Sequence, residues 1–165
     1  MADGDRELVG IGGWLAFFVF LIAFLTPLTL IGGLYLNMFA DTETAAVFGP
    51  KWRTLQVAES VATAFFVGLA WFLAYRLVNV RRRKTVRIVI AGLWLLALGG
   101  VLVDAALVIV FGGMDFGLVA DSAAPELVRP LLSATLWTAY FLMSKRVFNT
   151  YPEHGDSDDL ARIFS

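Results

Sequence analysis

Four long apolar segments alternate with short polar segments along the chain. The apolar segments lie near residues 12–36, 54–79, 88–111 and 126–144. A helix that crosses about 30 Å of hydrocarbon needs roughly 20 apolar residues, and each segment is long enough to supply them. The pattern therefore predicts an all-α integral membrane protein, built as a bundle of four spanning helices.

The polar segments divide the chain into three parts. Residues 1–9 form a short N-terminal segment, residues 10–151 hold the four spans, and residues 152–165 form an acidic tail. The tail is poor in apolar residues, so we expect it to be mobile. Pro27 lies inside the first span, and we expect a kink near residues 23–27 because proline removes a backbone donor and clashes with the preceding turn.

The composition excludes several classes of chemistry. Apolar residues make up 59% of the chain, above the roughly 45–50% of soluble domains, so the solvent of this fold is expected to be lipid. There is no cysteine, and the single histidine, His154, lies in the polar tail. Haem ligation by two histidines and catalytic triads that need a histidine are therefore absent from the spans. We expect no cofactor, no metal site and, at a net charge of −1, no nucleic-acid partner.

Most of the basic residues lie on one side of the predicted bundle. They are concentrated in the loop between the second and third spans, and two more follow the fourth span. Because lysine and arginine accumulate on the cytoplasmic side of membrane proteins, this side and both termini are predicted to be cytoplasmic. A second interpretation of the same residues is a contact surface for anionic lipid or a partner. The residues on this side are Arg81, Arg82, Arg83, Lys84, Arg87, Lys145 and Arg146.

Aromatic and small residues predict how the spans sit and pack. Trp14 and Tyr35 near the ends of the first span, and Tyr151 after the last, are placed as interfacial anchors. Helix association in lipid relies on close approach of small residues. Candidates for such contacts are Ala58, Ala62, Ala64 and Gly68 on the second span, and Ser133, Ala134 and Ala139 on the fourth.

Three ionisable residues fall inside the predicted spans, namely Glu59, Asp104 and Arg129. Counting about 1.5 Å per helical residue places all three about 6–10 Å in from the same membrane surface. An isolated charge at that depth is costly and should find a partner. Three interpretations remain open: an ion-pair clamp that sets helix register, a site for an ion, a proton or a polar ligand, and side chains that extend to water.

Two motifs lie at opposite ends of the membrane region. Gly10-Ile11-Gly12-Gly13-Trp14-Leu15 precedes and opens the first span, and Ser144-Lys145-Arg146-Val147 with Asn149-Thr150-Tyr151 follows the last. With the four-span layout, they make the chain similar to the bacterial membrane protein family catalogued as domain of unknown function 2569. The resemblance covers about residues 10–151. The chain departs from the family where a basic residue is common, at Phe148, and in its acidic tail.

The resemblance implies a membrane fold and location but no established activity. With no catalytic set, short loops and small-residue helix faces, the sequence favours a non-catalytic protein of the bacterial inner membrane. We expect it to act as an accessory or assembly subunit, with the lipid bilayer and another membrane protein as its partners. The alternative is a small ion- or proton-coupled carrier or channel that uses Glu59, Asp104 and Arg129.

Overall fold

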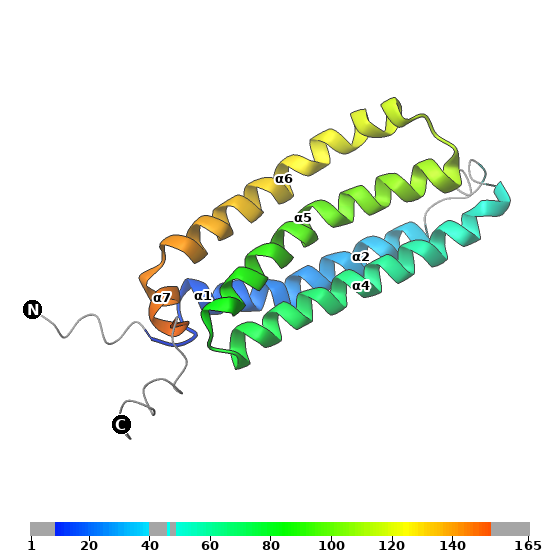
Figure 1. The fold of residues 1–165 in the computed structure, drawn as a ribbon. Coiled ribbons are helices and arrows are strands. Elements are labelled where there is room, and N and C mark those ends of the chain that lie inside the picture. Colours follow the sequence, from blue (N-terminus) through cyan, green and yellow to red (C-terminus); the bar gives the residue numbers. More distant parts are fainter. Residues whose placement is uncertain (1–8, 40–45, 47–48, 153–165) are drawn as a thin grey trace, which may run out of the picture.

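A computed structural model describes residues 9–39, 46 and 49–152. The described residues form helices joined by short connections, so the fold is all-α (Figure 1). The predicted N-terminal segment 1–9 and the predicted mobile tail 152–165 lie outside the described residues, except for Val9 and Pro152.

The chain opens with a continuous helical segment of three parts, α1 (Trp14–Phe20), η1 (Leu21–Leu25) and α2 (Thr26–Met38). A short turn, η2 (Gly49–Lys51), leads into the second long helix, α4 (Trp52–Asn79). The third and fourth long helices are α5 (Arg83–Gly112) and α6 (Phe116–Met143), and the short helix α7 (Lys145–Thr150) follows.

A π-helical turn interrupts the first helical segment where the sequence predicts a kink. The turn, η1, comes just before Pro27, which has no N–H to donate to the carbonyl of Ala23 four residues earlier. The indole N–H of Trp71 on α4 donates to that Ala23 carbonyl at 3.0 Å. The acceptor that proline leaves without its helical donor is thus used to join the first helical segment to α4.

Three helical segments are long and apolar enough to cross a membrane: Trp14–Met38, Gly49–Asn79 and Arg83–Gly112. α6 is as long as α4, at 28 residues, but it contains Pro125 and Pro130 and the charged residues Asp121, Glu126 and Arg129. α6 therefore has the length of a span with a less apolar composition.

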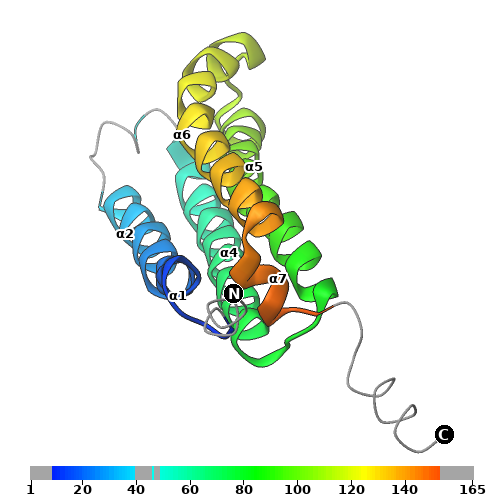
Figure 2. The ribbon, with the colours of Figure 1, turned by 90° about the vertical axis from the view of Figure 1, so that its left-hand side faces the viewer.

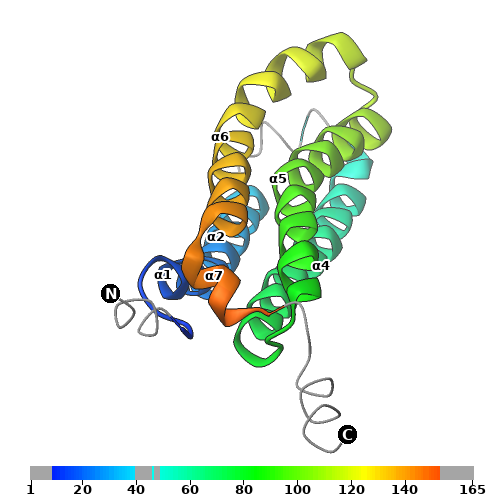
Figure 3. The same cartoon turned by 60° about the vertical axis from the view of Figure 1, so that its left-hand side comes forward.

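α6 begins ten residues before the predicted fourth segment, so most of the polar segment expected between residues 111 and 126 is helical. The reason is a local cap, because the Asp115 carboxylate accepts a hydrogen bond from the Gly117 N–H at 2.8 Å. The helix then continues through Pro125 and Pro130. Its N-terminal part runs at an angle to the rest (Figure 3), as expected where proline removes helical hydrogen bonds.

The long helices pack in the order α2, α4, α5 and α6. Contacts join α2 to α4, α4 to α5 and α5 to α6. Within the described residues, no contact of similar extent joins α2 to α6, and Figure 2 shows these two helices apart. We call the region between the first helical segment and α6 the α2–α6 seam.

The core is concentrated at one end of the molecule, which we call the α7 end. Its buried side chains come from the first helical segment, the end of α4, the start of α5, the end of α6, and α7. In the opposite halves of the long helices, described residues 32–38, 52–65, 98–112 and 116–129, only Leu55 and Val119 are buried. We call that region the open end. The core residues of the α7 end are Leu15, Phe18, Ile22, Ala70, Leu73, Ala74, Leu77, Val86, Val89, Phe141, Val147 and Tyr151.

Candidate functional site

The two sequence motifs, 140 residues apart, meet at the α7 end. The Gly10 N–H donates to the Thr150 hydroxyl oxygen at 2.9 Å, and that hydroxyl donates to the Arg146 carbonyl at 2.7 Å. The Arg146 guanidinium lies against Gly12, where an added Cβ would come within 2.6 Å of Nη1. We call residues 10–15 together with 144–151 the terminal clasp. It closes one end of the helix bundle with residues from both ends of the membrane region.

Tyr151 is part of the core of this clasp. The sequence places Tyr151 in the headgroup layer as an anchor, but its side chain is 0% exposed. Its hydroxyl donates to the Leu77 carbonyl at 2.6 Å, near the end of α4 where backbone acceptors lack helical donors. Burial raises the pKa of Tyr151 to about 12; the Arg81 charge opposes the shift and Tyr140 adds to it. Tyr151 therefore caps α4, and the anchor interpretation is wrong.

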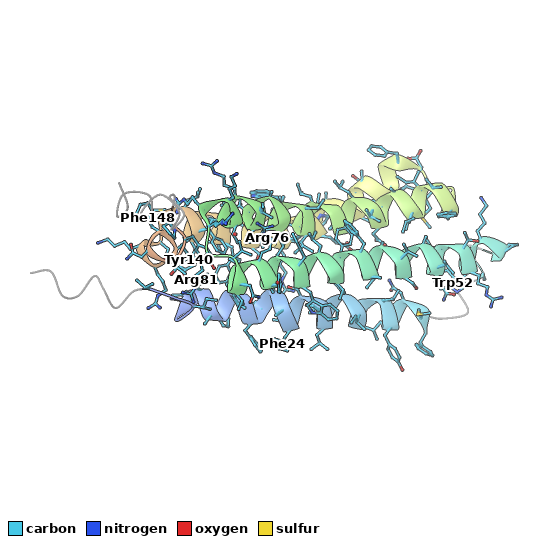
Figure 4. The ribbon with its side chains drawn as sticks, turned by 60° about the horizontal axis from the view of Figure 1, so that its bottom comes forward. Phe24, Trp52, Arg76, Arg81, Tyr140 and Phe148 are labelled. Atoms are coloured by element: carbon cyan, nitrogen blue, oxygen red, sulfur yellow. The ribbon has the colours of Figure 1, made fainter. Side chains whose placement is uncertain are left out.

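The predicted basic residues all lie at the α7 end, on the α4–α5 connection, the first turns of α5, and α7. Figure 4 shows Arg76, Arg81 and Phe148 there, far from Trp52 at the open end. The Arg83 guanidinium carbon lies 5.2 Å from the centre of the Phe148 ring, a cation–π distance. The Arg83 N–H donates to the Pro152 carbonyl at 3.2 Å, so Arg83 also helps to hold the end of the clasp.

Glu59 and Asp104 line one pocket of about 180 Å³ at the open end. Glu59 comes from α4 and Asp104 from α5, and Asn37 and Thr63 also line the pocket. The two carboxyl groups interact electrostatically, and Asp104 interacts in the same way with Glu126 of α6. Among the described residues, no group of three or more histidine, cysteine, aspartate or glutamate side chains could hold a metal ion.

Arg129 does not join this pocket. Its side chain lines two other cavities, of about 690 and 440 Å³, in the α2–α6 seam. Within the described part of the chain it makes no ion pair within 4.0 Å, so the predicted clamp with Glu59 or Asp104 is not formed. The residue counts place the three side chains at similar depth but leave open which way each one points. Arg129 lines the seam, away from the pocket shared by the two acids.

Trp14 begins α1 at the α7 end and is 66% exposed. Its ring packs edge-on against Phe17, with ring centres 5.7 Å apart, and it lines the larger seam cavity. This placement agrees with a side chain that faces lipid near one end of the bundle, and its position in a headgroup layer stays a prediction.

Several polar residues that share these sites were missed in the sequence. Asn37 and Thr63 line the pocket of Glu59, and Glu126 interacts with Asp104. A further polar contact joins α5 to α6, where the Trp94 indole N–H donates to the Thr138 hydroxyl at 3.2 Å. The sequence signal that could have identified these residues was their depth. A polar side chain inside an apolar segment forms hydrogen bonds with polar side chains at the same depth on neighbouring helices.

The fold and the sites define an α-helical membrane protein whose helices are packed together at the α7 end, exposed at the open end, and separated along the α2–α6 seam. The chain belongs to the family described as Protein of unknown function (DUF2569), which matches residues 8–152. The match spans both parts of the terminal clasp. No curated protein matches the chain, and no solved structure matches it.

Proposed function

We propose that this protein is a non-catalytic subunit of the bacterial inner membrane that acts by associating with another membrane protein. In this proposal α6 is a fourth span and the α7 end is cytoplasmic. The length of α6 and its packing along α5 support the first point. The basic residues at the α7 end support the second, since positive charge accumulates on the cytoplasmic side.

The observation that carries the association is the outward face of α4. Ala64 and Gly68 are one helical turn apart, and both are exposed. An added Cβ at Gly68 would meet no atom of another segment within 4 Å. Small residues at this spacing allow a second helix to approach closely in lipid. Because no residue that the structure describes fills the space beside Gly68, this face of α4 is available to a partner helix.

The test replaces glycine by leucine on two outward faces. Gly68→Leu fills the proposed contact, whereas Gly33→Leu on α2 is a matched control, since Gly33 is also exposed with no neighbouring atom within 4 Å. We expect native mass spectrometry of gently extracted wild-type protein to show a stoichiometric membrane-protein partner. Gly68→Leu should lose the partner and Gly33→Leu should keep it. A monomer or a pure homo-oligomer in the wild type would contradict the proposal.

Sidedness is tested separately with reporter fusions at Met1, Thr44, Met114 and Ser165. We expect cytoplasmic signals at both termini and periplasmic signals at the two internal positions. A periplasmic signal from either terminus would overturn the orientation.

A second candidate function is a small proton- or cation-coupled carrier. It is favoured by the pocket in which Glu59 and Asp104 lie beside Asn37 and Thr63. The test is proton or cation flux into liposomes that contain the purified protein. We expect Glu59→Gln to abolish flux if this function is correct, with Glu7→Gln, outside the spans, as the control. Absence of flux in the wild type would reject the carrier.

A further inference from the structure

The α2–α6 seam contains a long apolar groove. Its two cavities, of about 690 and 440 Å³, share Arg129, Ser133 and Trp137 as lining residues. Leu93, Leu96 and Ala97 of α5 line the smaller cavity, between the first helical segment and α6. The volumes fall in the range of ligand pockets, about 300–1,000 Å³. The groove exists because α2 and α6 do not pack against each other along their length.

Arg129 is the charged residue in this apolar groove. It makes no ion pair with any residue that the structure describes. A guanidinium at membrane depth is costly without an anion, and its planar array of donors matches the oxygens of a phosphate. Ser133 lies one helical turn further on, lines the same cavities, and offers a hydroxyl donor on the same side. Arg129 and Ser133 together form a binding site for an anionic group.

The groove below Arg129 has the form that an acyl chain requires. Along α6 it continues through Leu132, Leu136 and Trp137 to Tyr140. Eleven residues at about 1.5 Å each give about 16 Å, close to half of a hydrocarbon core of about 30 Å. At the α7 end Phe18 closes the seam, with ring centres 4.6 Å from Trp137 and 5.0 Å from Phe141.

We propose that the α2–α6 seam binds one anionic phospholipid, with its phosphate on Arg129 and Ser133 and one acyl chain along α6. The positive charge of Arg129 favours an anionic lipid over other occupants of the groove. A zwitterionic lipid would also bring a cationic group near the guanidinium. A second copy of the chain would need an acidic side chain opposite Arg129. The inference is independent of the proposed function, since α4 presents its exposed face outside the seam.

The experiment measures lipid adducts by native mass spectrometry of detergent-purified protein titrated with phosphatidylglycerol or phosphatidylcholine. We expect phosphatidylglycerol to bind the wild type more tightly. Arg129→Gln should weaken that binding at least about tenfold, which corresponds to about 1.4 kcal/mol, because the phosphate loses its charged donor. Arg53→Gln, near the start of α4 at the open end, removes an exposed guanidinium outside the groove and is the matched control.

A second variant tests the contribution of the groove's shape separately from that of the Arg129 charge. Ser133→Phe keeps Arg129 but places a ring in both cavities, and we expect it to exclude the lipid while the protein remains monodisperse in size-exclusion chromatography. Equal binding of the two lipids would overturn the proposal. So would wild-type affinity for phosphatidylglycerol in Arg129→Gln or in Ser133→Phe. A dimer that dissociates in Arg129→Gln would assign the groove to a second copy and also overturn it.

Discussion

At the α7 end the helices bury their side chains against one another, whereas at the open end the same helices leave theirs exposed. Leu77 near the end of α4 is fully buried, while Val57 and Val61 near its start are more than half exposed. Lipid is as apolar as these side chains, so hydrophobicity does not drive helices together in a membrane. The difference instead follows from specific packing, because α1 and α7 fill the α7 end and no element within the described residues fills the other.

The largest effect is expected when one aromatic ring is removed at each end of the molecule. Tyr151→Ala deletes a fully buried ring, and we expect the free energy of unfolding to fall by about 3–5 kcal/mol. Phe116→Ala at the open end removes a ring that is 73% exposed, and we expect a change within about 0.5 kcal/mol. Denaturant titration of detergent-solubilised protein measures both.

Tyr151→Phe isolates the hydrogen bond in the same assay. It keeps the ring but leaves the Leu77 carbonyl without the hydroxyl donor, and we expect a loss of about 1–3 kcal/mol. Equal losses in Tyr151→Ala and Phe116→Ala would show that the two ends do not differ in packing.

A smaller effect on stability is expected when two glycines of α5 are replaced by alanine. The sign of the change should differ between the α7 end and the open end. An added Cβ at Gly92 would lie 2.5 Å from Leu73 Cδ1, in the core of the α7 end. We expect Gly92→Ala to destabilise the protein by about 1–3 kcal/mol through overpacking. At Gly100 an added Cβ meets nothing within 4 Å, and alanine favours a helix over glycine by about 0.5–1 kcal/mol.

Thermal unfolding in the same detergent distinguishes the two changes. Gly92→Ala should lower the melting temperature and Gly100→Ala should raise it slightly. A higher melting temperature for Gly92→Ala would mean that the core around Leu73 is looser than its burial indicates.

The smallest expected effect is a change of stability with pH that is confined to alkaline solution. Burial raises the pKa of Tyr151 to about 12 in the folded protein, from a model-peptide value of about 10. The folded state then holds the phenolic proton more tightly than the unfolded state. The stabilisation is fully present below pH 10 and is lost as pH rises through about 12. The phenolate absorbance of the wild type minus that of Tyr151→Phe measures this titration, and a midpoint near 10 would contradict it.

The positions of the helices could be predicted well, because apolar run length follows directly from bilayer thickness. α4, at Trp52–Asn79, begins two residues before the expected segment and ends with it. The start of α6 could not be predicted in the same way, since the Asp115 cap and a helix that continues through Pro125 are local features within a polar stretch.

The arrangement of the charged residues was harder to predict. Residue counting gives depth along a helix, but the rotation of each helix must come from a polar and an apolar face, and these helices are apolar almost all round. Residue counting therefore gave Glu59, Asp104 and Arg129 a similar depth, but it did not give the direction of Arg129, which lines the seam instead of the pocket of the two acids. Tyr151 was misplaced for a related reason, because an aromatic residue after a span occurs both as an anchor and as a cap.

The hydrogen bond between Gly10 and Thr150 also has a consequence for the order of events during synthesis. A ribosome adds about 5–20 residues per second, so α1 is made several seconds before its partner residues in α7 exist. Phe18 likewise lacks the ring of Phe141 until the end of α6 has been made. Nascent chains stalled before Thr150 would carry all the long helices, yet their first residues would remain open to any membrane chaperone that recognises an unpaired helix.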